Sequence, residues 1–387
     1  MNKLLKTYDF TNFQIQKGKG SYLYSNNKRK FLDFSAGVAV NSLGYNHPTI
    51  INAIKSQIKT GITHLSGSQL HEFKLKLSTK LSTNTNNGDV FFSNSGTESI
   101  ETAIKVVRNI GSGQNRDEII AMTSSFHGRT IGSLSIGSNK KYKSSIGPVP
   151  GKVKFCQFND SKSLKKLITK KTIAIIFEVI QGDGGVNVCT KEFAKTIKDV
   201  CKKNNIYLII DEIQAGMGRS GMLFAYQYFK LKPDIVTLAK GLGSGIPIGA
   251  TIVHKDISKK IGLGFHGSTF GGGMLQTRVS YEVFNVINKS GFLQKVSKKA
   301  NLFRVLLENI RNKHSKLIKE IRGLGLLIGI EFHHSETAKL VFKQLMDNNV
   351  ITTLVQGSTI RITPPLIISE NEIKSGIKVL QKILEKL

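Results

Sequence analysis

The sequence predicts an α/β protein whose central sheet is largely parallel. Short apolar runs alternate with amphipathic, helix-like stretches from Val90 onward, and that alternation is typical of a parallel sheet covered by helices. With 387 residues and 40% hydrophobic content, the chain can bury one large domain and a smaller one. The predicted strands are residues 91–92, 119–120, 173–179, 206–210, 235–239 and 248–253.

The two ends of the chain differ from this middle part. Residues 1–47 contain short strand-like pieces at 21–24 and 30–34. From residue 279 a long helical region leads to a glycine-punctuated strand at 321–330, a helix at 337–348 and a strand at 358–363. Ser369 and Glu372 form a capping box for a last helix. We therefore expect a terminal segment at 1–47, a large domain at 48–278 and a small domain at 279–387.

The composition excludes several classes of protein. The formal charge is +30, but only 10 of the 56 basic residues are arginine, and the lysines are spread along the chain instead of forming one stripe. This dispersion argues against specific nucleic-acid binding and favours attraction of small anionic substrates. No apolar run approaches the length of a membrane span, no signal peptide is recognisable, and three scattered cysteines lack metal-ligand spacing. We expect a cytoplasmic protein with no metal site and no membrane partner.

Ser95-Gly96-Thr97-Glu98 follows a predicted strand and opens a helix. One interpretation is a cap, in which the Ser95 hydroxyl accepts a hydrogen bond from the Glu98 amide. The other adds that Gly96 and Thr97, at a helix N-terminus, present N–H groups and a hydroxyl to a phosphate. The sequence favours neither.

Residues 216–221 read Gly-Met-Gly-Arg-Ser-Gly and match the dinucleotide pattern GxGxxG. No helical periodicity begins inside these glycines, and Asp211-Glu212 occupies the strand end where a pyrophosphate would need room. We interpret the stretch as a flexible structural turn.

Two charged residues stand at the ends of buried strands. Asp211 follows the run 206–210, and Lys240 follows 235–239 and precedes a glycine-rich turn. A lysine there is either paired, deprotonated or extended to the sheet edge, and lysines with a lowered pKa form Schiff bases. A carboxylate at a neighbouring strand end could hold a protonated pyridine nitrogen. Together with a phosphate-binding helix start, these residues predict a site for pyridoxal 5′-phosphate.

Eight motifs occur in the order found in one family. They include Phe92-Ser-Asn-Ser-Gly-Thr-Glu98, Phe126-His-Gly-Arg-Thr130, Glu178-Val-Ile-Gln-Gly182, Asp211-Glu-Ile-Gln214, Leu238-Ala-Lys-Gly241 and Ser268-Thr-Phe-Gly-Gly272. Over nearly its whole length the chain resembles the class III (fold type I) pyridoxal-phosphate aminotransferases, and among them the acetylornithine aminotransferases. The resemblance implies a large cofactor-binding domain, with both chain ends forming the small α+β domain.

The resemblance also implies the cofactor contacts. Lys240 would bind the cofactor covalently and move the proton, and Asp211 would keep the ring nitrogen protonated. Phe126 and Ile213 would cover the two ring faces. The remaining implied contacts are Gln214 at the ring oxygen, Ser95, Gly96 and Thr97 at the phosphate, and Thr269 reaching the phosphate from a neighbouring subunit, which implies a homodimer.

Substrate contacts follow in the same way. Bidentate carboxylate recognition favours arginine over lysine. Arg129 and Arg361 are therefore candidates, each with an ordinary salt bridge as the alternative. By resemblance, Arg361 binds the α-carboxylate of glutamate and Arg129 a carboxylate of the diamino-acid substrate. Glu178, Asp183 and Tyr8 are further candidates, and His127 could support the ring.

The chain departs from the family at three places. Asp183 replaces the usual glutamate that pairs with the arginine at 361, and because aspartate is one methylene shorter we expect this pairing not to close in the usual geometry. Gly273-Met274 replaces the usual Asn-Pro. Gly67-Ser68-Gln69 replaces larger residues that, in the family, line the site next to the substrate or the partner subunit.

The resemblance predicts transfer of the terminal amino group of N-acetylornithine to 2-oxoglutarate, in arginine biosynthesis. N-succinyl-diaminopimelate, ornithine, 4-aminobutyrate or another diamine are alternative donors. A different alternative is a basic nucleic-acid-binding protein that keeps only the fold.

Overall fold

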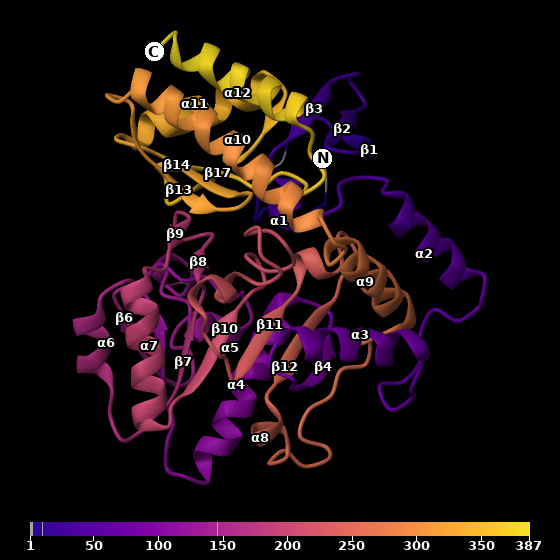
Figure 1. Ribbon diagram of the computed structural model, residues 1–387, viewed down its shortest axis with the longest axis vertical. Coiled ribbons are helices and arrows are strands. Elements are labelled where there is room, and N and C mark those ends of the chain that lie inside the picture. Colours follow the sequence, from indigo (N-terminus) through magenta and orange to yellow (C-terminus); the bar gives the residue numbers. More distant parts are fainter. Residues whose placement is uncertain (1–2, 10, 145) are drawn as a thin grey trace.

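A seven-stranded sheet forms the centre of the chain in the computed structural model, which describes residues 3–9, 11–144 and 146–387 (Figure 1). Its strand order is β4-β12-β11-β10-β7-β5-β6. β12 is antiparallel to both of its neighbours, and every other pair is parallel, which confirms the predicted largely parallel sheet. The strands are β4 (Asp89–Ser93), β5 (Glu118–Met122), β6 (Lys152–Cys156), β7 (Thr172–Phe177), β10 (Tyr207–Asp211), β11 (Ile235–Leu238) and β12 (Gly249–Val253).

Both faces of this sheet are buried, as a parallel sheet requires. Neighbouring residues of one strand belong to different apolar clusters: Ile175 packs in one and Ile176 in the other. Helix α4 covers the Ile176 face and α7 the Ile175 face. The helices of this part are α2 (Pro48–Ile58), α3 (Glu72–Asn84), α4 (Gly96–Ser112), α5 (Ile131–Ser135), α6 (Ser161–Leu167), α7 (Lys191–Asn204), α8 (Lys255–Ser258) and α9 (Met274–Ile287).

The N-terminal and C-terminal segments meet above this sheet (Figure 1). β3 pairs in parallel with β15, Leu32 opposite Val350, so one small sheet contains strands from both ends. It has the order β1-β2-β3-β15, and a second sheet has the order β13-β14-β17-β16. The strands are β1 (Ile15–Lys19), β2 (Tyr22–Ser25), β3 (Lys30–Asp33), β13 (Ile318–Leu324), β14 (Leu327–Phe332), β15 (Val350–Ile351), β16 (Thr353–Val355) and β17 (Thr359–Ile362).

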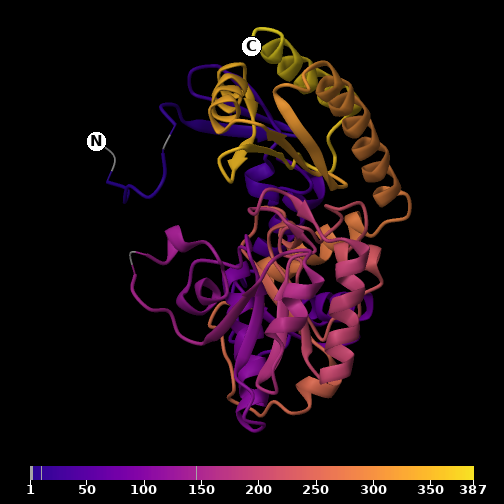
Figure 2. The same ribbon diagram turned by 90° about the vertical axis from the view of Figure 1, so that its left-hand side faces the viewer.

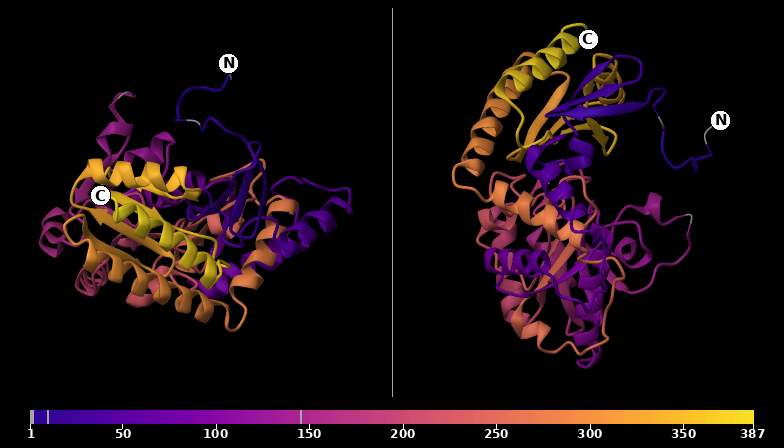
Figure 3. Two further views of the ribbon diagram at one scale, coloured as in Figure 1. Left: turned by 90° about the horizontal axis from the view of Figure 1, so that it is seen from above. Right: turned by 90° about the vertical axis from the view of Figure 1, so that its right-hand side faces the viewer.

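Three helices complete the C-terminal part, and α10 and α12 lie against each other (Figure 3). The Ser369 hydroxyl accepts from the Glu372 amide at 3.3 Å while the Glu372 carboxylate accepts from the Ser369 amide at 2.7 Å, which confirms the capping box. The helices are α10 (Phe292–Lys313), α11 (Ser335–Asp347) and α12 (Glu370–Leu384). Short elements elsewhere are α1 (Ala36–Ala39), β8 (Ile180–Gln181) and β9 (Asn187–Val188).

The prediction of a single strand at 321–330 is wrong. The chain turns back at Gly325, and β13 and β14 form an antiparallel hairpin. Gly325 has a φ of +60°, and a methyl group there would lie 2.2 Å from the carbonyl carbon of Ser220. Glycine is needed at this point both for the left-handed conformation and for the close approach of another turn.

The expected boundary at residue 278 falls inside α9, which packs against α2 and α3. The helical region from 279 to 314 is two helices, because Gly291 (φ +81°) separates α9 from α10. No helix in the described ranges is long and apolar enough to cross a membrane.

Candidate active site

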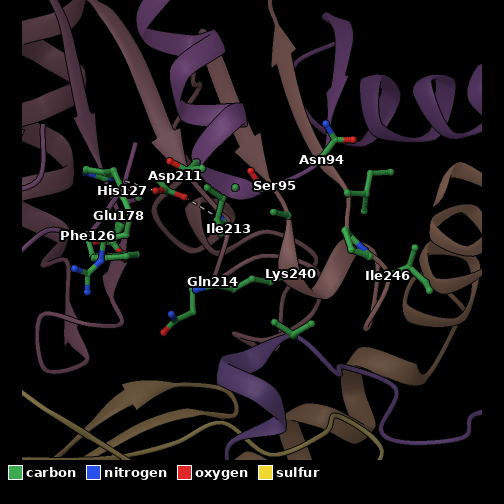
Figure 4. A pocket seen from close by; sticks show the side chains of 18 of the residues that line it. Asn94, Ser95, Phe126, His127, Glu178, Asp211, Ile213, Gln214, Lys240 and Ile246 are labelled. Atoms are coloured by element: carbon green, nitrogen blue, oxygen red, sulfur yellow. Dashed lines mark hydrogen bonds and ion pairs between the residues drawn. The ribbon is translucent and has the colours of Figure 1, made fainter. Parts of the chain in front are cut away.

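A cavity of about 390 Å³ opens at the carboxyl ends of β10 and β11 (Figure 4). This is the edge of a parallel sheet where ligands bind in open α/β folds. Most of the residues predicted from the sequence line it. They are Ser95, Gly96, Thr97, Phe126, Arg129, Glu178, Asp211, Ile213, Gln214 and Lys240.

Asp211 is buried at the end of β10 and is held by two hydrogen bonds. Its Oδ1 accepts from the Ile213 amide at 2.9 Å, and its Oδ2 accepts from His127 Nδ1 at 2.7 Å. His127 is itself only 2% exposed, and its Nε2 has no partner among the described residues. The orientation of the Asp211 carboxylate is therefore fixed. The contact also gives His127, which the sequence suggests as a supporting residue, a specific partner.

Lys240 begins a short 3₁₀ turn (Lys240–Leu242) directly after β11. Its φ of +43° lies in the left-handed region, which residues other than glycine rarely adopt and which occurs often at functional sites. Burial lowers the pKa of Lys240, and Arg361 lowers it further, while Asp183, Asp211 and Glu178 oppose the change. A lysine that points into a cavity with a lowered pKa is suited to act as a nucleophile and a base.

The start of α4 borders the cavity, at the place where the sequence predicts a cap and a phosphate cradle. Ser95 Oγ accepts from the Glu98 amide at 3.3 Å, so the predicted cap is present. The first amides of a helix have no intrahelical acceptor and can bind an anion. Thr97 Oγ1 is held by the hydroxyls of Thr130 at 2.8 Å and Ser133 at 2.7 Å.

Gly128 keeps this cradle open. Its φ is +136°, and a methyl group there would lie 2.3 Å from Thr97 Oγ1. We predict that Gly128→Ala lowers cofactor affinity at least about tenfold, because the methyl group displaces Thr97 and the backbone must leave the conformation that glycine permits. Titration of apoenzyme with pyridoxal phosphate, followed by absorbance, measures this. Gly262→Ala is the control, since nothing lies within 4 Å of a methyl group at Gly262; equal affinities in the two variants would contradict the prediction.

Arg361 lies on β17 and reaches the cavity wall from the small domain. Its side chain is 3% exposed, and its Nε donates to Thr353 Oγ1 at 3.0 Å. Its Nη1 donates to Gln214 Oε1 at 3.2 Å and forms an ion pair with Asp183. The pairing closes in this structure, because the shorter Asp183 side chain still reaches the guanidinium group. Burial disfavours the ionised Asp183, but the charges of Arg361 and Lys240 outweigh it and lower the pKa of this carboxyl group.

Arg129 lines the cavity, is exposed and lies over two aromatic rings. Its guanidinium carbon is 3.5 Å from the ring centre of Tyr142 and 5.6 Å from that of Phe126. Stacking of this kind orients an arginine while leaving its N–H groups available to a carboxylate. Tyr142 was not predicted, because no periodicity links it to Arg129.

Glu178 is buried behind Phe126. Its Oε2 accepts from the Phe126 amide at 3.1 Å, so it fixes the backbone that carries the ring. Burial raises the pKa of Glu178 well above its usual range, and the carboxylates of Asp211 and Asp183 add to the rise. The raised pKa favours protonated Glu178, which can donate a hydrogen bond into the cavity.

Four predicted residues are not among those that line this cavity: Arg361 and Asp183, which pair beside it, and Thr269 and Tyr8. Thr269 is exposed and borders a separate hollow with Asn94, Ser268 and Phe270. Tyr8 is 75% exposed, in the described part of the segment before β1, which extends away from the body of the molecule (Figure 2).

Comparison with known proteins decides the family. A family model described as aminotransferase class-III matches residues 6–384. The chain belongs to the class-III aminotransferases. It is 40% identical over 387 residues to acetylornithine aminotransferase from Caldanaerobacter subterraneus subsp. tengcongensis, covering 99% of this chain and 98% of that protein. It is 39% identical over 389 residues to acetylornithine/succinyldiaminopimelate aminotransferase from Buchnera aphidicola subsp. Acyrthosiphon pisum, covering 99% and 95%.

Solved structures agree with this class-III assignment. Ornithine aminotransferase from Toxoplasma gondii ME49 has a TM-score of 0.93 at 28% identity, covering 99% of this chain and 93% of that one. N-acetylornithine aminotransferase from Stenotrophomonas maltophilia K279a has a TM-score of 0.84 at 28% identity, covering 97% and 96%. The protein is a transaminase with the fold type I architecture, and its cofactor is pyridoxal 5′-phosphate.

The residues of this aminotransferase fit that cofactor. An oriented carboxylate for the ring nitrogen, a lysine with a lowered pKa and a helix start kept open by Gly96 and Gly128 all border one cavity. A methyl group at Gly96 would lie 3.0 Å from Ile213, so Gly96 also leaves room beside the residue predicted to cover a ring face. When bound, pyridoxal 5′-phosphate supplies an aldehyde that reacts with amines and a ring that accepts the electrons released at the substrate carbon.

Proposed function

We propose that this aminotransferase moves the terminal amino group of N-acetylornithine to 2-oxoglutarate, as a step of arginine biosynthesis. The observation that carries the proposal is the presence of two arginines at one cavity with Lys240: Arg129 lines the cavity, and Arg361 contacts the lining residue Gln214. Two guanidinium groups suit a dicarboxylic 2-oxo acid such as 2-oxoglutarate, and one of them suits the single carboxylate of N-acetylornithine. The names of relatives that are 37–40% identical over nearly the whole chain support the same substrate.

Each residue then has a task in two half-reactions. With the cofactor bound, Lys240 Nζ would take the proton from the substrate carbon that carries the amino group, for which its lowered pKa suits it. Asp211 would face the ring nitrogen and favour its protonated form. Arg361 receives the α-carboxylate of 2-oxoglutarate, and Asp183 occupies Arg361 when the amine donor is bound.

A donor comparison tests this function. The purified, cofactor-loaded protein is mixed with N-acetylornithine, ornithine, N-succinyl-diaminopimelate or 4-aminobutyrate, and the visible spectrum is followed during each single half-reaction. We expect N-acetylornithine to react fastest. Turnover of N-acetylornithine no faster than that of 4-aminobutyrate would defeat the specific assignment.

N-succinyl-diaminopimelate is the second candidate donor. The Buchnera aphidicola relatives that are 39–40% identical carry both substrates in their names. The same half-reaction comparison separates the two, because a shared function predicts comparable rates for both acylated donors and slower rates for free ornithine.

A homodimer is the proposed assembly, and the location of Thr269 supports it. Thr269 is exposed outside the cavity of its own chain, where it can reach a second copy. We propose that it contacts the phosphate bound in that copy, and that the enzyme works in the cytoplasm. Mixing inactive Lys240→Ala and Thr269→Ala proteins tests the shared site, since exchange of subunits would restore one intact site per mixed dimer.

The ion pair between Asp183 and Arg361 makes a separate prediction. Asp183→Asn removes the charge that competes with the α-carboxylate for Arg361, so KM for 2-oxoglutarate is expected to fall roughly fivefold, or about 1 kcal/mol. The amine donor should bind less well, because Arg361 then remains unpaired in that half-reaction. Steady-state kinetics of both substrates measure the change, and Asp183→Glu serves as the charge-preserving control. A rise of KM for 2-oxoglutarate in Asp183→Asn would contradict the proposed competition.

A further inference from the structure

Arg219 is a fully buried arginine outside the cavity. It lies in the stretch 216–221, all of which is buried, although the sequence interpretation of this stretch is a flexible turn. Its side chain is 1% exposed and is among the largest that the described part of the chain buries completely. Burying a charged guanidinium group is unfavourable in free energy, so we expect Arg219 to have a role that compensates for it.

The loop that carries Arg219 is fastened to Asp211. Glu212, next to Asp211, accepts hydrogen bonds from the amides of Ala225 at 2.9 Å and Tyr226 at 2.8 Å through its carboxylate. Its carbonyl accepts from the Gly216 amide at 2.9 Å. The loop is thus closed at its base, and Arg219 stands in a fixed relation to the carboxylate at the end of β10.

Arg219 reaches from this loop into the small domain. Its Nη1 donates to the carbonyl of Leu326 at 3.1 Å and to the carbonyl of Pro364. The Leu326 amide in turn donates to the Arg219 carbonyl at 2.9 Å. Leu326 is in the turn between β13 and β14, and Pro364 follows β17, three residues after Arg361. β14 and β17 are neighbours with Gly329 opposite Arg361, so one guanidinium group holds both strands.

The rest of the guanidinium group argues for a specific role. Its Nε and Nη2 have no hydrogen-bond partner among the described residues, and the nearby carboxylate of Asp33 partly compensates the charge. Burial lowers the pKa of Arg219, and Asp33 opposes that change. Methionine would fill similar space without burying a charge, but it could not donate to Leu326 and Pro364. What arginine adds here is the link between the two domains.

We propose that Arg219 is a positioning residue that fixes Arg361 relative to Asp211 and Lys240. The link runs from Asp211 through the Glu212 loop to Arg219, and from Pro364 to Arg361 on β17. The inference rests on the proposed function in one respect, which is that Arg361 binds the α-carboxylate of 2-oxoglutarate. Its consequence is selective. The half-reaction that uses Arg361 depends on Arg219, and the half-reaction in which Asp183 occupies Arg361 depends on it much less.

Two variants of the cofactor-loaded full-length enzyme test the proposal. Arg219→Met is expected to lower kcat/KM for 2-oxoglutarate about tenfold, less than the ~100-fold that a 1 Å misplacement can cost. It should lower kcat/KM for N-acetylornithine by less than about threefold, since that half-reaction leaves Arg361 paired with Asp183. Arg219→Lys keeps one charged donor and should recover part of the activity with 2-oxoglutarate, to within about threefold of wild type. Borohydride reduction should still label residue 240 in both variants.

A matched control separates positioning from loss of stability. Leu164→Ala removes a fully buried side chain from α6, away from the cavity, and should lower the thermal midpoint while leaving the ratio of the two kcat/KM values unchanged. Equal losses in both half-reactions of the Arg219 variants, or no loss in either, would overturn the proposal. If Arg219→Met does not fold, Arg219→Lys alone tests the proposal. We then expect the ratio of kcat/KM for 2-oxoglutarate to kcat/KM for N-acetylornithine to change about threefold. An unchanged ratio would contradict the proposal.

Failure of the proposed function would appear elsewhere. It would be seen in the wild-type enzyme, as absence of turnover with N-acetylornithine. In that case the amine donor that does support turnover replaces N-acetylornithine in the comparison. The effect of the Arg219 variants on kcat/KM for 2-oxoglutarate is measured as before.

Discussion

Lys240→Ala is expected to lower kcat by at least about 10³-fold, the upper range for loss of a positioned acid–base group. The reason is that Lys240 alone among the described cavity-lining residues carries an amine. Its removal takes away the covalent attachment of the cofactor and the group that moves the proton. Turnover measures the first effect, and borohydride reduction followed by peptide mapping should show no pyridoxyl label at position 240.

The pH dependence of the wild-type enzyme belongs to the same prediction. Burial, then Arg361, lowers the pKa of Lys240, and the proposed base is the neutral amine. Activity should therefore rise with pH through a pKa below the usual range of lysine. Lys154→Ala is the control. Lys154 lies on β6, outside the cavity, and its Nζ forms an ion pair with the Glu118 carboxylate at 2.8 Å. A Lys240→Ala enzyme that keeps a tenth of its turnover, or is labelled at another lysine, would refute the assignment.

The sequence predicts the parts of the site that depend on one strand and the residues directly after it. Asp211 and Lys240 each follow a buried run, and the carboxyl ends of parallel neighbours meet at one sheet edge, so their proximity follows from the fold class. Ser95 is likewise local, because a cap involves residues three apart. The resemblance to a family then supplies roles that spacing cannot.

Contacts between distant segments were not predictable in this way. Asp183 and Arg361 are 178 residues apart, and whether an aspartate reaches depends on how β17 sits against the large domain. For that reason the sequence alone could not show that the ion pair forms. Tyr142 under Arg129 and Arg219 between Leu326 and Pro364 are further cases, since each contact is set by packing and not by local periodicity.

Two secondary-structure errors have simpler causes. β6 has the sequence Lys-Val-Lys-Phe-Cys and lies at the edge of the sheet. Because lysines alternate with its apolar residues, it lacks the continuous apolar run from which the other strands are predicted. The hairpin of β13 and β14 was read as one strand because its apolar residues continue on both sides of Gly325. There the turn depends on a glycine that fits against Ser220, a contact that lies outside the hairpin itself.

Asp211→Asn is expected to lower kcat about 10²–10³-fold, the range for losing one preorganised electrostatic contact in a closed site. Asp211 now accepts from two donors, the Ile213 amide and His127 Nδ1. An asparagine must turn its NH₂ group toward one of them, so either the loop after β10 or the His127 ring has to change. The negative charge at the ring nitrogen is lost in both cases, and with it the stabilisation of electrons that move into the ring.

The lysine chemistry should survive in this variant, which separates the two residues. Borohydride reduction should still label residue 240 in Asp211→Asn, while kcat falls. Asp234→Asn is the matched control: Asp234 is half-buried and accepts from the Leu208 amide at 2.8 Å, outside the cavity, so its loss should lower the thermal midpoint with kcat within about threefold of wild type. A kcat of Asp211→Asn within tenfold of wild type would mean that the ring nitrogen does not depend on this carboxylate. The acid at the end of β10 would then serve only to hold Ile213 and His127 in place.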